Sequence, residues 1–175
     1  NAVLSLIRAR PQAAEAALES LSDLFRAAMR DPCELVSLAD EIALAKQYLE
    51  LENLRLGERL VIDWQIGEVS MGLPIPPLML QPLLENAVYH GIEPSPEGGT
   101  VRIGIEQKGD ELRIAIANPT AGQAQHAAGN QMAVANIRER LALYYDLEAR
   151  LEIEVGDNCY EVRIILPCQR HPLPR

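Results

Sequence analysis

The chain has 175 residues, of which 48% are hydrophobic, and 25 acidic against 16 basic residues give a formal net charge of −9. This length suits one domain with a small appendage, and the composition supplies a packed core. The acidic balance excludes nucleic acid as an expected partner, because neutralising phosphates needs a basic face, and it requires any polyphosphate ligand to be held locally by a metal ion and backbone N–H groups.

The first third of the chain is predicted to be helical, because apolar residues recur there at helical spacing. A first segment stops at Asp31-Pro32. A second begins after Ser37, where Asp40 and Glu41 supply the acidic first turn typical of a helix start, and Gly57 breaks it. The first segment carries an apolar stripe that predicts packing on a second copy of the chain or on its own domain: Leu18, Leu21, Leu24 and Phe25.

From Leu60 onward the apolar residues mostly alternate with polar ones, which is typical of strands with one solvated face. Strands are predicted over about 60–66, 101–106, 112–116, 151–155 and 160–166, with helices over about 78–90 and 133–146. Turns at Lys108-Gly109-Asp110 and Gly156-Asp157-Asn158 join two strand pairs. This order predicts an α+β fold, an α/β sandwich in which a mostly antiparallel sheet carries its helices on one face.

The helix predicted over 78–90 carries the most informative motif, LQPLLENAVYHG, from Leu80 to Gly91. Glu85 offers a carboxylate base, and Asn86 offers a neutral oxygen that suits a hard cation such as Mg²⁺. His90 follows four residues after Asn86. Such a pair on an amphipathic helix can also be a plain solvated edge, so its significance depends on the motifs around it.

Further motifs occur in a fixed order around this helix. The chain reads YLELENLRLGERL from Tyr48, IPPLMLQPLLENAVYHG from Ile75 and NIRERL from Asn136. Together they resemble the cytoplasmic kinase region of LytS/AlgZ-type sensor histidine kinases, which belong to the Bergerat (GHKL) ATPases, and the resemblance covers nearly the whole chain. It implies connector helices followed by a Bergerat-type, mostly antiparallel five-stranded sheet, with ATP and Mg²⁺ as ligands.

The resemblance also implies an organisation. Residues 1–56 would be the end of the dimerisation and phosphoacceptor region with its connector, 57–168 the ATP-binding catalytic domain, and 169–175 a tail. Asn1 aligns with the last residue of the phosphoacceptor motif, so the acceptor histidine is expected upstream, and none of His90, His126 or His171 matches it. We therefore expect a piece of an inner-membrane sensor's cytoplasmic domain, connected to the membrane only through an N-terminal region outside this chain.

By the same resemblance, Glu85 is the base or orienter for the attacking imidazole, and Asn86 is the magnesium ligand that bridges the ATP phosphates. His90 contacts phosphate or the lid, or else caps the helix C-terminus, where Gly91 suits a chain reversal. Tyr89 stands where many of these kinases place a lysine against the phosphates.

The family's strand-end motif, DxGxG, is altered here. It reads from Asn118 to Gly122, with Asn118 in place of the aspartate and Thr120 in place of the first glycine. Asn118 can still accept a hydrogen bond from the adenine amine, without the charge-assisted component. Alternatively, Asn118-Pro119 is a turn that ends the strand.

The glycine-rich phosphate motif, GxGLGLxN, retains only Gly129 and Asn136. Gln131 and Ala133 replace glycines, which makes positive φ values costly, but a helix start near Ala133 can still offer N–H groups to a phosphate. Four apolar side chains either line an adenine slot or belong to the core: Ile114, Ile116, Met132 and Val134.

Three functions compete. The retained Glu85 and Asn86 favour a histidine kinase that passes a phosphoryl group to an upstream histidine and then to a response regulator, of the LytTR type by resemblance, in a homodimeric protein. The altered glycine motifs favour a degenerate domain with weak or no ATP binding that serves dimerisation and regulator docking. A third possibility, another ATPase of the superfamily such as an anti-sigma kinase or a topoisomerase-like clamp, is disfavoured by the connector. The kinase is the function we predict.

Overall fold

The computed structural model describes residues 18, 22, 34–120 and 129–168. Strands and helices follow the predicted order, with two short strands, β1 and β3, that the sequence pattern did not reveal. The elements are β1 (Val36–Ser37), α3 (Leu38–Leu56), η1 (Gly57–Arg59), β2 (Leu60–Ile66), β3 (Pro74–Ile75), α4 (Gln81–Asn86), η2 (Ala87–Ile92), β4 (Gly99–Lys108), β5 (Glu111–Pro119), α5 (Gly129–Tyr145), β6 (Arg150–Val155) and β7 (Cys159–Pro167).

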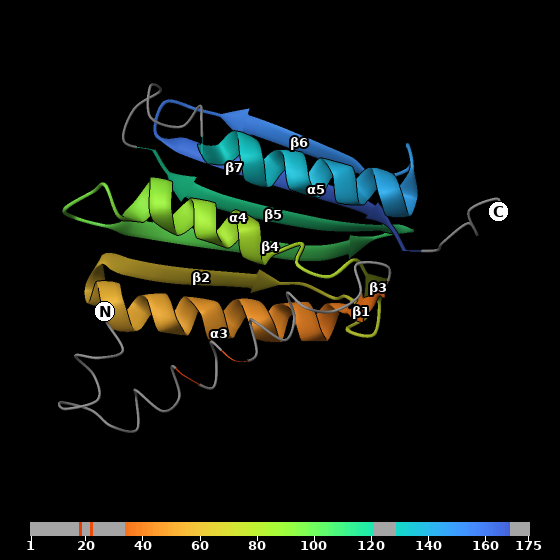
Figure 1. Ribbon diagram of the computed structural model, residues 1–175, viewed down its shortest axis with the longest axis horizontal. Helices are drawn as coiled ribbons and strands as arrows, with labels where there is room; N and C mark the ends of the chain where they lie inside the picture. The colour runs from red at the N-terminus through yellow and green to blue at the C-terminus, as the bar shows by residue number, and fades with distance from the viewer. Residues whose placement is uncertain (1–17, 19–21, 23–33, 121–128, 169–175) are drawn as a thin grey trace.

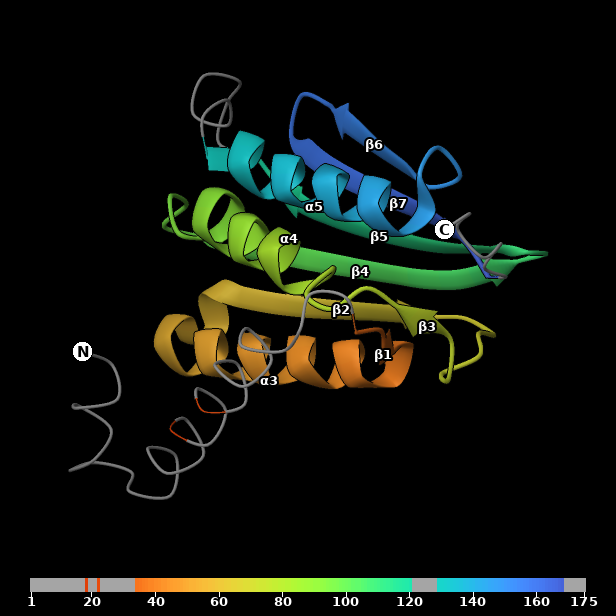
Figure 2. The same ribbon diagram turned by 45° about the vertical axis from the view of Figure 1, so that its right-hand side comes forward.

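Five strands form one sheet in the order β2-β4-β5-β7-β6. The β2–β4 pair is parallel and the other three pairs are antiparallel. Figures 1 and 2 show α3, α4 and α5 side by side on one face of this sheet, with α3 along β2. The predicted α+β architecture, a mostly antiparallel five-stranded sheet with its helices on one face, is confirmed.

The core lies between the sheet and the three helices. Alternate residues of the central strands point into it and are almost completely buried, while their neighbours on the other face are half-buried or exposed. The strands contribute Val101, Ile103, Ile105, Leu112, Ile114, Ile116, Val162, Ile164 and Leu166, and the helices contribute Leu38, Ile42, Ala45, Leu49, Ile137, Leu141 and Tyr144. The connector helix α3 therefore packs into the same core as the sheet.

Helix α3 starts where its sequence predicts. The Ser37 side chain accepts from the backbone N–H of Asp40, and the Asp40 carboxylate accepts from the backbone N–H of Ser37, which is a capping box. The helix ends at Leu56, directly before the predicted break at Gly57, which has φ of 60°, a value that favours glycine. Among the described helices, none has the length and apolar character needed to cross a bilayer.

Candidate functional site

The LQPLLENAVYHG motif forms one continuous helical segment, α4 followed by the π-helical η2. It begins three residues later than the predicted Leu78, because Leu78 has φ of 56° and cannot be part of a right-handed helix. It also continues to Ile92, so Gly91 is a helical residue and not the C-terminal reversal we considered. π-Helical turns are uncommon and recur at functional sites.

The segment is amphipathic. One face is buried against the core and consists of Leu83, Leu84, Ala87, Val88, Gly91 and Ile92. On the other face Glu85 and Tyr89 are exposed, while Asn86 and His90 are half-buried. Glu85 accepts a hydrogen bond from Nε2 of Gln81 at 2.8 Å, and the rings of Tyr89 and His90 meet edge to face with centroids 4.8 Å apart. The structure thus brings the predicted residues Glu85, Asn86 and His90 together on one accessible face.

Gly91 connects this helix to the second predicted site element. A Cβ built on Gly91 would lie 2.4 Å from Nδ2 of Asn118, so a larger residue does not fit without displacing that side chain. Asn118 lies near the end of β5, is only 5% exposed, and donates through Nδ2 to the carbonyl oxygen of Pro119 at 2.8 Å. The close approach of η2 to β5 therefore explains the glycine, and the chain reversal that was one of two alternatives at this end of the helix does not occur at Gly91.

The third predicted element, the altered glycine-rich phosphate motif at the start of α5, provides only some of the expected site residues. Helix α5 begins at Gly129, so the helix start that we predicted near Ala133 is wrong, and the N–H groups without helical partners lie within the first turn, at about 129–132. Met132 is 73% exposed, Ala133 is half-buried, and Asn136 is exposed. Val134 is buried, as are Ile114 and Ile116, so these three are core residues and not the walls of an open slot. Gly122 lies outside the described residues.

A buried carboxylate that we had assigned only to a helix start holds the approach to the motif helix. Glu41 of α3 is 3% exposed, and its oxygens accept from the backbone N–H groups of Leu78 at 2.5 Å, Met79 at 2.9 Å and Leu80 at 3.2 Å. Burial raises the pKa of Glu41, while these hydrogen bonds and the nearby Arg140 act in the opposite direction. From α5, Arg140 donates to the carbonyl oxygens of Pro77 and Leu78.

Two arginines, Arg55 near the end of α3 and Arg59 in η1, hold the C-terminal end of the same segment. Nη2 of the half-buried Arg59 donates to the carbonyl oxygens of Glu93 at 2.9 Å and Ser95 at 2.7 Å, with a longer contact of 3.5 Å to Ile92. Arg55 forms ion pairs with the carboxylates of Glu93 and Glu52. Both arginines belong to the YLELENLRLGERL motif, so this family motif also has a structural role.

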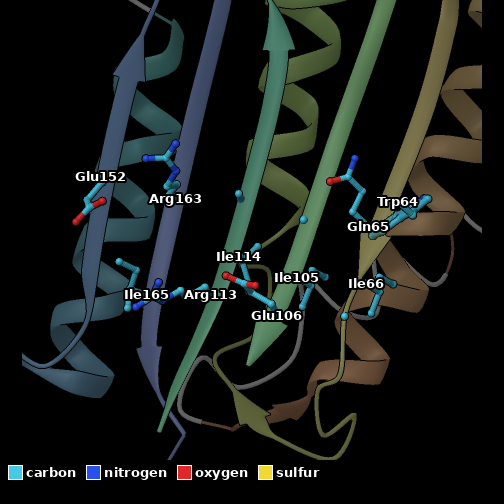
Figure 3. Close-up of a pocket in the computed structure, with 13 residues that line it drawn as sticks. Trp64, Gln65, Ile66, Ile105, Glu106, Arg113, Ile114, Glu152, Arg163 and Ile165 are labelled. Atoms are coloured by element: carbon cyan, nitrogen blue, oxygen red, sulfur yellow. The ribbon is translucent and has the colours of Figure 1, made fainter. Parts of the chain in front are cut away.

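A separate groove lies on the opposite face of the sheet (Figure 3). It has a volume of about 770 Å³, and its floor includes a row that crosses four strands, Gln65, Gly104, Ala115 and Arg163. Figure 3 shows the helices behind the sheet from this side, and none of the motif residues lines the groove. The candidate site is therefore on the helical face, and this groove is not part of it.

Comparisons with known proteins agree with this geometry. The model of the histidine kinase family matches residues 1–60. Sensor histidine kinase YpdA of Escherichia coli (strain K12) is 30% identical over 99% of this chain, and 32% of YpdA is covered. Sensor protein LytS of Streptococcus mutans is 28% identical over 97% of this chain, with 31% of LytS covered. The chain thus spans about a third of the length of these curated relatives.

Solved structures show the same fold. The histidine kinase domain of a blue-light activated kinase of Erythrobacter litoralis superposes with a TM-score of 0.58 at 17% identity, covering 95% of this chain and 86% of that one. Full-length ShkA, in complex with AMPPNP, gives a TM-score of 0.53 at 21% identity, covering 93% of this chain and 38% of ShkA.

The motifs also resemble those of AlgZ (FimS) of pseudomonads, and this similarity stays a prediction. The matches to the family model, to YpdA and to LytS agree with the motif order and with the fold. The chain belongs to the sensor histidine kinases, with LytS proteins among its relatives.

Proposed function

We propose that this chain is the ATP-binding catalytic part of its sensor kinase, and that it transfers the γ-phosphoryl group of Mg·ATP to a histidine upstream of Asn1. One observation carries the proposal: the motif helix with Glu85 and Asn86 is packed directly onto Asn118 through Gly91. Two elements far apart in sequence, each with a predicted nucleotide contact, are therefore held in one place. Phosphoryl transfer depends mostly on positioning and charge stabilisation, and such an arrangement supplies the positioning.

Asn86 is the residue we assign to the metal. Mg²⁺ prefers oxygen ligands and commonly takes one or two from the protein, the rest coming from phosphates and water. The carboxamide of Asn86 is half-buried on the accessible face and adds no negative charge to a chain whose net charge is −9. When bound, the ion would neutralise charge on the phosphates, and Asn86 would fix its place relative to the helix.

Asn118 is the residue we assign to adenine. Its Nδ2 is already bound to the carbonyl oxygen of Pro119, which leaves Oδ1 as the atom that accepts from the exocyclic amine of the base. This fixed orientation partly offsets the missing charge of the family's aspartate. The exposed Met132 and the half-buried Ala133 would lie against the nucleotide, and the buried Val134 would support them from the core.

The phosphates would be met by the start of α5 and by the motif helix. Backbone N–H groups in the first turn from Gly129 suit an anion, because they lack helical partners and lie at the positive end of the helix dipole. His90 and the exposed Asn136 are further phosphate or lid contacts, and Gly122 belongs to the same proposal by resemblance. Glu85 is exposed and would orient or deprotonate an imidazole that approaches from solvent.

For the whole protein we propose a homodimeric inner-membrane sensor that presents this domain to the cytoplasm and passes the phosphoryl group to a LytTR-type response regulator. The LytS relative and the resemblance of the motifs support the type of regulator. The AMPPNP complex of ShkA supports the nucleotide, since the two chains share a fold.

A degenerate docking module is the second candidate, and specific substitutions favour it. Asn118 replaces an aspartate, and Gln131 and Ala133 replace glycines of the phosphate motif. Such a module would keep the fold and the dimer surface, and would bind a regulator without phosphorylating it.

Phosphohistidine formation distinguishes the two candidates. The assay uses the protein extended upstream through its phosphoacceptor histidine, with γ-labelled ATP and Mg²⁺. We expect acid-labile phosphohistidine in the wild type and a loss of at least about 100-fold in Asn86→Ala, the scale on which misplacing a reacting group acts. Absence of phosphohistidine in the wild type, together with retained regulator binding, would favour the docking module.

A further inference from the structure

Helix α3 and the η1 turn that follows it hold the motif helix at both of its ends. Glu41, in the first turn of α3, receives the N–H groups that precede α4, and Arg59, at the end of η1, donates to carbonyl oxygens beyond η2. An acidic side chain thus faces the N-terminal end of the segment and a basic one faces its C-terminal end, which is the arrangement that the helix dipole favours. Figure 1 shows α3 and α4 lying along the same side of the sheet.

Three donors converge on the single carboxylate of Glu41. One oxygen accepts from the N–H of Leu78, and the other accepts from the N–H groups of Met79 and Leu80. Glutamine has the same shape but carries oxygen on only one side, so its NH₂ group would face an N–H donor in either orientation. Aspartate is one methylene shorter and would not reach. The site is therefore built for glutamate specifically.

Leu78 shows that this contact determines the backbone conformation. Its φ of 56° is unfavourable for a leucine. Its N–H is bound by Glu41 and its carbonyl oxygen by Arg140, so α3 and α5 hold this one residue from two sides. The direction in which α4 leaves Leu78 follows from these two contacts.

We propose that Glu41 is a positioning residue of the nucleotide site: by fixing the chain at Leu78 to Leu80 against α3, it sets the position of Asn86 along the axis of the motif helix. This role rests on the proposed function. Asn86 lies six residues beyond Leu80 on a continuous helical segment, or about 9 Å at 1.5 Å per residue, so a shift at Leu80 is passed on to Asn86.

A purely structural role makes a different prediction. If Glu41 only stabilised the fold, its replacement would lower the melting temperature and leave the nucleotide affinity of the folded protein unchanged. If Glu41 positions Asn86, replacing Glu41 lowers the nucleotide affinity of protein that is still folded, and this loss occurs only when Asn86 is present.

The test is a double-mutant cycle on this chain with Mg·AMPPNP as the ligand. Affinity is measured by calorimetry, at a temperature at which every variant is folded by circular dichroism, for the wild type, Glu41→Gln, Asn86→Ala and the double variant. We expect Glu41→Gln to weaken binding about 10-fold when Asn86 is present and less than about 2-fold when it is absent, as for two coupled residues. Glu50→Gln, an exposed glutamate on the same helix, is the matched control and should match the wild type.

A second substitution, made in the Glu41→Gln background, separates the effect of Glu41 on stability from its effect on the position of Asn86. Leu78→Gly removes the strain at the positive φ, so it should restore the melting temperature of Glu41→Gln. Affinity should stay low in that double variant, because glycine restores no contact to α3. If affinity returns together with stability, Glu41 has a structural role only and the proposal is wrong.

The remaining outcomes are also decisive. A wild-type affinity in Glu41→Gln overturns the positioning role and leaves the proposed function intact. No saturable binding by the wild type overturns the proposed function, and the positioning role with it. If Glu41→Gln does not fold, Arg140→Met replaces it in the cycle. Methionine removes the Nη1 group that donates to the carbonyl oxygens of Pro77 and Leu78, and the loss of affinity must then depend on Asn86 in the same way.

Discussion

Gly91 and Asn118 lie in direct contact, so that the Cα of one occupies the space beside the carboxamide of the other. A Cβ on Gly91 would come within 2.9 Å of both Cβ and Cγ of Asn118 and within 2.4 Å of its Nδ2. The contact joins the motif helix to the end of β5. It makes the positions of the proposed metal ligand, Asn86, and of the proposed adenine contact, Asn118, depend on one another.

Substitution of Gly91 should therefore disturb the site and not only the fold. In Gly91→Ala the added methyl group has to push Asn118 or η2 aside, at a cost of about 1–3 kcal/mol in unfolding free energy for an overpacked position. ATP affinity should fall by about 10-fold, because Asn118 is displaced. Calorimetry and urea unfolding measure the two effects. Gly72→Ala is the control, since nothing lies within 4 Å of a Cβ there, and it should leave ATP affinity unchanged.

Asn118→Asp should separate affinity from stability. Aspartate cannot donate to the carbonyl oxygen of Pro119, so the ligand-free protein should lose about 1–2 kcal/mol of stability. The carboxylate would accept from the adenine amine with charge assistance, so ATP should bind more tightly by about 1 kcal/mol. Thermal unfolding with and without Mg·ATP should show a lower starting melting temperature and a larger ligand-induced increase. An unchanged or smaller increase would argue against adenine at this position.

Arg59 should matter for stability more than a surface arginine does. Arg59→Met removes the side-chain donor to the carbonyl oxygens of Glu93 and Ser95, of which Ser95 keeps the N–H of Gly98, and should cost about 1–3 kcal/mol in urea unfolding. Arg102→Met is the matched control, because Arg102 is more than half exposed and pairs with Asp63 at 3.3 Å on the open face of the sheet. Its loss should cost less than about 1 kcal/mol. Equal losses in the two variants would contradict the role given to Arg59.

The pH dependence of stability should report on Glu41. Burial raises its pKa in the folded chain, so between the unfolded and the folded value the folded chain holds a proton that the unfolded chain has released. The stability contributed by this group is complete below the unfolded pKa and declines as pH rises through the folded one.

Urea unfolding of the wild type and Glu41→Gln, from about pH 4 to 8, measures this slope. The variant should lack the decline and the Glu50→Gln control should keep it. Glu111, whose pKa is lowered by Arg113, contributes the opposite slope, but it is common to all three proteins and cancels in the comparison. Parallel curves for the wild type and Glu41→Gln would contradict the interpretation.

Local patterns in the sequence predicted the local structure. Alternation of apolar and polar residues predicted β4, β5 and β7. The residues of the Ser37 capping box predicted the start of α3, and the turn at Gly109 predicted the β4–β5 hairpin. The order of motifs then gave the architecture, because each element has one place in the family's fold.

What could not be predicted depends on contacts between distant residues. Glu41 and Leu78 are 37 residues apart, so a glutamate that looks like a helix start is in fact a buried anchor. Glycine is common at helix ends, so the sequence suggested one at Gly91. Only the contact with Asn118 of β5 shows why this residue is glycine. Helix α5 begins at Gly129, four residues before the predicted start near Ala133. The sequence did not reveal this first turn, because glycine is a poor helix former.

Titration of this chain with ATP, in the presence of Mg²⁺ and again in EDTA, tests the central claim most directly. The chain should bind ATP saturably with Mg²⁺, and both EDTA and Asn86→Ala should weaken binding by at least about 10-fold, with no further effect of EDTA on the variant. Binding that is equal in all four conditions, or absent in all four, would contradict an Asn86-held Mg·ATP site on the motif helix.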